Sequence, residues 1–204
     1  MAALRPEDLD FISSFDTVWA VVLGAVLATL GGFAATQMER IVGRQERERS
    51  AALLFGEVLA TLAVILELAG ETHGRGDPYG PVTMRLLRSA RREMDIYERN
   101  RERLFDLRDG ELRARIHTAM VRLSVPFDGV FDTTREVAEL ENRVLAAGMS
   151  STETDARRAM LCERREAAFE FALEAAAQLQ PFIVQLEPLA RHSFQGLGEI
   201  ARGG

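Results

Sequence analysis

The histidines are the residues best suited to acid–base catalysis or metal binding, and their spacing does not match a known site. His73, His117 and His192 fall in three different segments, with no HExxH motif and no Glu-x-x-His pair around them. Zinc and di-iron sites need such ligands at fixed spacing on a helix or in a short loop. We therefore expect no metal and no other cofactor, and we interpret His117 as an ordinary histidine at the edge of a helix and His73 as a loop residue.

The other reactive residues exclude several enzyme classes. All 25 basic residues are arginines, so chemistry that requires a lysine, including the P-loop and Schiff-base formation, is absent. Cys162 is the single cysteine, which excludes an intrachain disulfide and CxxC motifs, and we interpret it as a small apolar core residue. No GxSxG, GxGxxG or GxxxxGK[ST] motif occurs. We predict that the protein is not an enzyme.

One uncharged run has the length of a membrane-spanning helix. It covers 18 residues from Val18 to Ala35, which is about 27 Å of α-helix against a hydrocarbon core of about 30 Å. The charged residues before the run are mainly acidic, whereas four arginines follow it: Arg40, Arg44, Arg47 and Arg49. Because arginine-rich flanks stay in the cytoplasm, we predict an outside N-terminal tail (1–17) and an uncleaved transmembrane helix (18–37) in a bacterial inner membrane.

Small residues recur every four positions along this helix, at Ala20, Gly24, Ala28, Gly32 and Thr36. Such a row lets another helix approach closely, so it predicts a packing face for a second copy or for another integral membrane protein. The run is rich in glycine, alanine and threonine throughout, so a row of this kind also arises by chance. Both interpretations stay open.

A second apolar run covers residues 51–70 and is also long enough to span a membrane. Glu57 and Glu67 lie within it, and a carboxylate near the bilayer centre costs about 2.5 to 3.5 kcal/mol. We therefore favour a core helix in a water-soluble bundle. The alternative is a hairpin of two membrane helices.

Beyond the membrane helix, the periodicity predicts an all-α protein. The first helix is expected to continue to about residue 69, with a loop at 70–81, and further helices over 82–107, 110–147 and from about 152 onward. Pro126 predicts either a bend or two separate helices, and Pro181 and Pro188 interrupt the last helix. The expected inward-facing residues include Val82, Met94, Tyr97, Phe105, Leu123, Phe127, Leu145, Leu161, Phe169, Phe171, Leu179 and Phe182. Four such helices predict an antiparallel cytoplasmic bundle over 38–194, followed by a flexible tail at 195–204.

Charge is unevenly distributed along the predicted bundle. Residues 37–126 hold 16 arginines against 14 carboxylates, and residues 128–188 hold 6 against 12. Three arginines of the second helix, Arg85, Arg88 and Arg92, are candidates for contact with anionic lipid headgroups. Asp95, Glu98 and Glu102 lie three or four positions from other arginines of this segment, which favours pairing within the helix instead. With a sequence pI near 5.2 we expect no nucleic-acid partner.

These features together predict a membrane-anchored interaction or scaffold protein. We expect it to contact the lipid bilayer and to associate with itself or with another integral membrane protein through the small-residue face. An accessory subunit of a larger membrane complex and a signalling bundle are the alternatives.

Overall fold

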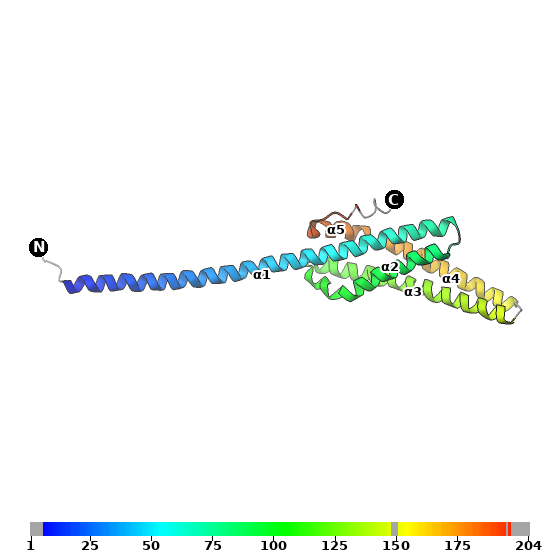
Figure 1. The fold of residues 1–204 in the computed structure, drawn as a ribbon, viewed down its shortest axis with the longest axis horizontal. Helices are drawn as coiled ribbons and strands as arrows, with labels where there is room; N and C mark the ends of the chain where they lie inside the picture. Colours follow the sequence, from blue (N-terminus) through cyan, green and yellow to red (C-terminus); the bar gives the residue numbers. More distant parts are fainter. Residues whose placement is uncertain (1–5, 148–150, 195, 197–204) are drawn as a thin grey trace. The chain divides into compact units, whose positions relative to one another are not determined.

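The described part of the chain is helical and contains no strand, which confirms the all-α prediction (Figure 1). The computed structural model describes the backbone of residues 6–147, 151–194 and 196, and the side chains in those ranges except at 6–21, 34, 35 and 147. The chain divides into two units, Met1–Glu46 and Arg47–Gly204.

Helix α1, Pro6–Arg75, runs through both units. In the first unit it is the only described element. Among the described helices, α1 is the one that is long and apolar enough to cross a membrane.

The second unit is a helical bundle. Its elements are the C-terminal part of α1, α2 (Pro81–Asn100), the 3-10 helix η1 (Arg101–Asp106), α3 (Gly110–Ala147), α4 (Thr152–Ala177) and α5 (Gln180–Ala190). The apolar run at 51–70 lies at the centre of its core, where Phe55, Leu59 and Leu66 are completely buried. Glu57 and Glu67 lie on the exposed side of the same helix. The run is therefore a core helix of the bundle, and its carboxylates need no partner inside a membrane.

Contacts between neighbouring helices show their directions. Helix α2 runs opposite to α1 and to α3, and α4 runs opposite to α1, so α2 and α4 run in the same direction. The contacts are Thr83 with Thr72 and Tyr97 with Phe55 for α2 and α1, Arg91 with Asp128 and Tyr97 with His117 for α2 and α3, and His73 with Glu166 and Gly70 with Leu173 for α1 and α4.

Two predicted helix starts are confirmed by their capping contacts. The carboxylate of Asp109 accepts hydrogen bonds from the backbone N–H groups of Glu111 and Leu112 at the start of α3. At the start of α4 the Ser151 hydroxyl accepts the Thr154 N–H at 3.2 Å. These side chains satisfy backbone donors that the first turn of a helix leaves unpaired.

The loop predicted over residues 70–81 is wrong at its start, because α1 continues to Arg75 and the turn covers only 76–80. Tertiary contacts hold the extra turn in place. The Thr83 hydroxyl of α2 donates to the Thr72 hydroxyl at 3.3 Å, and the His73 ring stacks on Phe169 at a centroid distance of 4.4 Å. Packing of this kind outweighs the low helix propensity of the glycines at 70 and 74.

Four side chains expected inside are exposed: Val82, Phe105, Leu145 and Phe171. In α2 the inward row is Thr83, Met84, Leu87, Ala90, Met94 and Tyr97, so Val82 falls just outside it. Phe105 lies in η1, whose tighter winding changes the direction of the side chains after Asn100. Leu145 lies near the end of α3.

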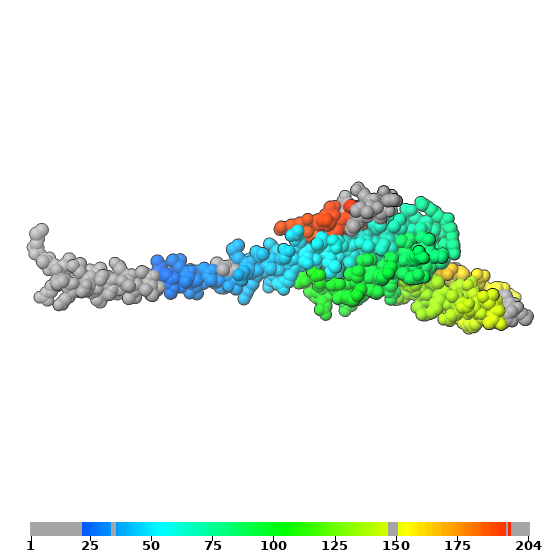
Figure 2. Space-filling model, viewed as in Figure 1, coloured from blue at the N-terminus to red at the C-terminus, as the bar shows by residue number. Residues whose placement is uncertain are grey.

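Helices α3 and α4 extend past the turn that joins α1 and α2 (Figures 1 and 2). There they pack on each other through a separate small cluster of Val137, Leu140, Leu161 and Cys162. Helix α3 continues through Pro126 as one helix, and the last predicted helix is divided at residues 178–179, before Pro181. The predicted tail, apart from Gly196, lies outside the described residues.

Candidate interaction surfaces

The apolar part of α1 has two different sides. At 100° per residue, the large residues of positions 22–33 lie within an arc of about 140°, and these are Val22, Leu23, Val26, Leu27, Leu30 and Phe33. The small residues Gly24, Ala25, Ala28, Gly31 and Gly32 cover about 120° on the other side. All of these residues are exposed. A helix of this kind presents a flat side and a bulky side to its surroundings.

The small side is open to a close approach. A Cβ atom added at Gly24 or Gly32 would meet nothing within 4 Å. The Thr36 hydroxyl donates to the Gly32 carbonyl at 2.9 Å and the Thr29 hydroxyl to the Ala25 carbonyl at 2.8 Å, so neither donor is left unpaired in an apolar surrounding. The side chain of Ala20, the first residue of the predicted row, lies outside the described residues.

The four arginines after the apolar run do not form one group. Arg40, Arg44 and Arg47 are exposed and follow one another at a spacing of four and three residues along α1. Arg49 is also exposed, but its Nε donates to the Ala190 carbonyl at 3.3 Å, at the end of α5. Arg49 therefore takes part in the packing of the bundle.

Four of the five arginines of α2 are exposed, Arg91 being partly buried, and these four have no ion pair with a described residue. Among the described residues, the ion pairs of α2 are Arg91 with Asp95 and Asp128, and Glu98 with Arg101. The hydrogen bond to Asp128 raises the pKa of Arg91. Arg85, Arg88 and Arg92 have no ion pair with a described residue. Of the three, only Arg92 has a carboxylate three or four positions away, and that residue, Asp95, pairs with Arg91 instead.

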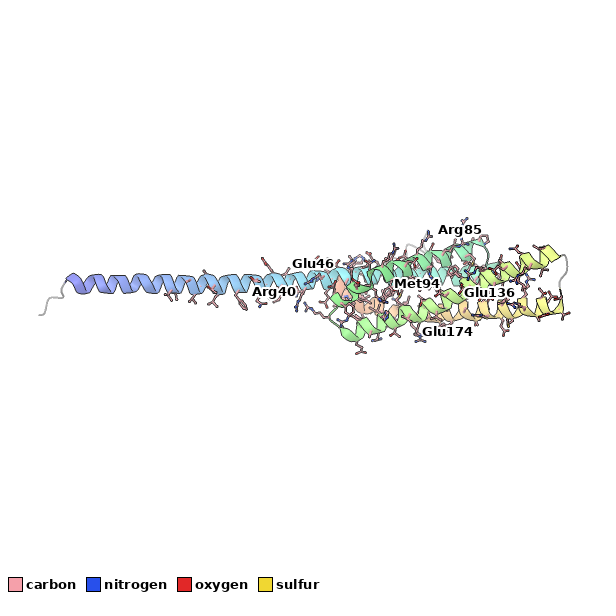
Figure 3. The ribbon with its side chains drawn as sticks, turned by 90° about the horizontal axis from the view of Figure 1, so that it is seen from below. Arg40, Glu46, Arg85, Met94, Glu136 and Glu174 are labelled. Atoms are coloured by element: carbon pink, nitrogen blue, oxygen red, sulfur yellow. The ribbon has the colours of Figure 1, made fainter. Side chains whose placement is uncertain are left out.

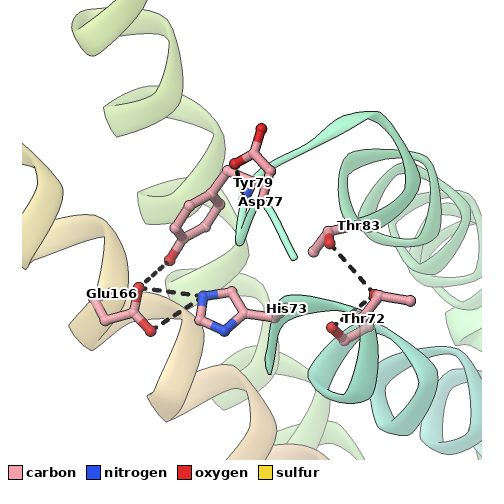
Figure 4. A network of polar contacts seen from close by, with 7 residues as sticks. Thr72, His73, Asp77, Tyr79, Thr83 and Glu166 are labelled. Carbon is pink, nitrogen blue, oxygen red and sulfur yellow. Dashed lines mark hydrogen bonds and ion pairs between the residues drawn. The ribbon is translucent and has the colours of Figure 1, made fainter. Parts of the chain in front are cut away.

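A network of polar contacts joins α1, the α1–α2 turn and α4 (Figure 4). Glu166 of α4 is its centre: its carboxylate lies 3.1 Å from His73 Nε2 and accepts a hydrogen bond from the Tyr79 hydroxyl at 3.0 Å. The guanidinium carbon of Arg165 lies 3.7 Å from the centre of the Tyr79 ring. These contacts connect residues about 90 positions apart in the chain.

The network has the properties of a structural clamp. Phe169 covers one face of the His73 ring and Tyr79 meets it edge-on at 5.2 Å, while Nε2 is held by Glu166. Burial, followed by the hydrogen bond to Glu166, raises the pKa of Tyr79, so its hydroxyl stays neutral and remains a donor. The correction for His73 is clear: it is a half-buried residue of α1 and not a loop residue.

The other two histidines lie elsewhere. The Nδ1 atom of His117 lies 3.0 Å from the Tyr97 hydroxyl, and exposed His192 lies beside Phe194. Among the described residues, no group of three or more His, Cys, Asp or Glu side chains is placed to hold a metal ion. Sequence periodicity found none of the Glu166 contacts, because they join segments far apart in the chain and follow no local motif.

Compared with protein-family models, with curated proteins and with solved structures, the chain gives no significant match.

Proposed function

We propose that the protein is a single-pass, membrane-anchored interaction protein that assembles through the small-residue side of its first helix. In this proposal residues 18–37 span a bacterial inner membrane, the N-terminus lies outside, and residues 38–194 form an antiparallel bundle in the cytoplasm. The observation that carries the proposal is the separation of small and large residues around positions 22–33.

Helix association inside a bilayer depends on close van der Waals contact, because lipid chains are as apolar as leucine side chains. A broad side built from glycine and alanine allows two helix backbones to approach each other. The bulky side fits contact with lipid. Exposed Val, Leu and Phe side chains over three turns are unfavourable in water, which supports a membrane surrounding for this segment.

Enlarging the small side tests the proposal. Gly24→Leu together with Gly32→Leu should strongly reduce association of the full-length protein in mild detergent, measured by sizing and by co-purification of two differently tagged copies. The control is Val22→Leu with Val26→Leu, which enlarges the bulky side of the same helix and should leave association unchanged. Unchanged association in the glycine variant, with the bundle still folded by circular dichroism, would remove the proposed packing side.

Topology is tested by labelling in intact cells. A cysteine introduced at Ser14 in a Cys162→Ser background should react with a membrane-impermeant maleimide, whereas one at exposed Ala156 should react only after lysis. The opposite labelling pattern would reverse the proposed orientation.

An accessory subunit is the second candidate, because the same small side fits a helix of another integral membrane protein equally well. Purification of the full-length protein from native membranes, followed by mass spectrometry, distinguishes the two. A stoichiometric integral membrane partner indicates the subunit, and a pure homo-oligomer indicates self-assembly.

A further inference from the structure

One face of α2 carries a row of unpaired arginines. Arg85, Arg88, Arg92 and Arg99 lie within about 60° of arc at 100° per residue, and all four are exposed. We call this row the arginine face. None of the four forms an ion pair with a described residue, and the neighbouring Asp95 pairs with Arg91 at 3.9 Å. The row extends about 21 Å along the helix.

One face of α4 carries the opposite charge. Glu163, Glu170 and Glu174 lie within about 40° of arc and are exposed. We call this row the glutamate face. The structure gives these three carboxylates no hydrogen bond or ion pair with a described residue, in contrast to Glu166, which points into the clamp with His73. The small exposed residue Ala167 lies beside the row.

The two faces lie on opposite sides of the bundle. Both α2 and α4 contact α1 and α3, as the contacts Thr83–Thr72, Arg91–Asp128, His73–Glu166 and Arg122–Gln178 show. They therefore occupy opposite corners of a four-helix arrangement. Figure 3 shows Arg85 and Glu174 at opposite edges of the bundle. The arginine face of one copy cannot meet its own glutamate face, but it can meet that of a neighbour.

The charges of the two faces also lie at matching heights. Thr83 of α2 contacts Thr72, and Phe169 of α4 stacks on His73, the next residue of α1. Thr83 and Phe169 therefore lie at nearly the same level of the bundle. Because α2 and α4 run in the same direction, equal steps from these two residues reach equal levels.

Counting residues along α2 from Thr83 and along α4 from Phe169 shows which arginine and which glutamate lie at the same level. Arg85 lies two residues beyond Thr83, and Glu170 lies one residue beyond Phe169. Arg88 and Glu174 each lie five residues beyond the same references. When two copies lie side by side in the same orientation, Arg85 faces Glu170 and Arg88 faces Glu174.

We propose that copies of this chain associate head to tail, with the arginine face of one bundle against the glutamate face of the next. Such a contact joins two different surfaces, so it produces a ring or an open row and not a two-fold dimer. The inference rests on the proposed function in one respect: anchoring in one membrane gives all copies the same orientation and a high local concentration. Exposed ion pairs are weak individually and screened by salt, so this concentration matters.

A cysteine pair in the full-length, membrane-embedded protein tests the contact. In a Cys162→Ser background, one tagged copy carries Arg92→Cys and a second, differently tagged copy carries Ala177→Cys. Ala177 is exposed on the same side of α4 as the glutamate face. Arg92 lies nine residues beyond Thr83 and Ala177 lies eight residues beyond Phe169, so the two positions are at nearly the same level of the bundle. Mild oxidation in native membranes should give a disulfide between the two tags. Moving the second cysteine to Ala156, on the same face of α4 but about 31 Å further along, should reduce the yield at least several-fold.

Charge reversal makes the test specific. Arg85→Glu with Arg88→Glu on the Arg92→Cys copy should reduce the disulfide yield several-fold, and so should Glu170→Arg with Glu174→Arg on the Ala177→Cys copy. Combining the two reversed copies should restore it, because the complementary charges are present again with their signs exchanged.

The proposal is overturned by an equal disulfide yield at Ala156 and Ala177, by unchanged yield in both single reversals, or by no recovery when the two reversed copies are combined. A loss with the arginine reversal alone would assign that face to anionic lipid or to another acidic partner, and would equally overturn it. Repeating the experiment with Gly24→Leu and Gly32→Leu separates this contact from the membrane packing side. Disulfide formation that persists in this variant supports the charged contact even where the membrane packing side fails.

Discussion

The C-terminal segment of the chain is held on α1 at a glycine. The Phe194 ring, 2% exposed, lies against Gly56, and a Cβ atom added at Gly56 would be 2.1 Å from the ring carbon Cζ. That separation is far below van der Waals contact, so Gly56→Ala must move the ring out of its place. We expect the substitution to destabilise the bundle although alanine is the better helix former.

The size of the effect follows from two opposing contributions. Losing the burial of the Phe194 ring costs about 1.5 to 3 kcal/mol. Replacing glycine by alanine inside a helix contributes up to about 1 kcal/mol in the other direction. The net loss for Gly56→Ala is therefore about 0.5 to 3 kcal/mol, which lowers the melting temperature by roughly 2 to 4 °C per kcal/mol for a chain of this length.

The decisive measurement is a double-mutant cycle on the full-length protein in mild detergent, followed by thermal unfolding and circular dichroism. In a Phe194→Ala background the ring is absent, so Gly56→Ala should change sign and raise the free energy of unfolding by up to about 1 kcal/mol. The control is Gly74→Ala, where an added Cβ meets nothing within 4 Å and no loss is expected. Equal destabilisation by Gly56→Ala in both backgrounds would refute the contact as the cause.

Three further predictions concern the bundle. Leu179 has no exposed surface, so Leu179→Asp should lower the free energy of unfolding, measured in urea, by several kcal/mol. Leu145 is 79% exposed, so Leu145→Asp should change the free energy of unfolding by no more than about 0.5 kcal/mol. Equal effects of the two substitutions would show that Leu179 does not lie in the core. Burial, with a smaller contribution from Glu98, raises the pKa of Tyr97 from 10.0 to about 12. The folded state therefore retains the phenol proton more tightly than the unfolded state, and stability is complete below pH 10 and falls by at most about 3 kcal/mol between pH 10 and 12. Between pH 10 and 12 the free energy of unfolding should fall less in the Tyr97→Phe variant than in the unsubstituted protein, as measured by urea unfolding at each of the two pH values. Glu166→Gln should lower the free energy of unfolding by about 1 to 3 kcal/mol because it weakens two hydrogen bonds, while Glu163→Gln on the same helix, without such partners, should be nearly neutral; a neutral Glu166→Gln would show that the clamp does not stabilise the bundle.

Local rules predicted most of the fold. The 3.6-residue periodicity identified Met94, Tyr97, Leu123, Phe127 and Leu161 as core residues, and all five are buried. The predicted helix starts, at 110 and about 152, also agree with those of α3 and α4. These features depend on neighbours within one or two helical turns, which a single sequence contains in full.

Features set by distant contacts were not predictable in the same way. The extra turn of α1 after residue 70 depends on Phe169, which stacks on His73 from nearly 100 residues away. Leu145 has the correct period for an inward residue, yet it is 79% exposed. Periodicity gives the direction of a side chain, whereas burial also requires that another helix reach that level.

The candidate interaction surfaces were also predictable only in part. The row of small residues was visible in the sequence, but its significance depends on the bulky side opposite to it, which is a property of the helix as a whole. Arg85 and Arg88 have no carboxylate three or four positions away, so their lack of an ion pair within α2 follows from spacing. Asp95 lies at such a position from both Arg92 and Arg99, yet it pairs with Arg91 instead. Only coordinates show which arginine Asp95 pairs with.

The two proposed contacts differ in their physical basis, and this difference makes them separable in one protein. Packing of glycine and alanine inside a bilayer depends on shape and is insensitive to ionic strength, because the contact excludes both water and ions. The charged contact between α2 and α4 lies in water, where the Debye length falls from about 30 Å at 0.01 M salt to about 3 Å at 1 M. A salt titration of the full-length protein should therefore reduce larger assemblies to a salt-resistant unit held by the membrane helix alone. If both contacts exist, the chain assembles in two steps, with a permanent unit in the membrane and a salt-dependent array of bundles built from it.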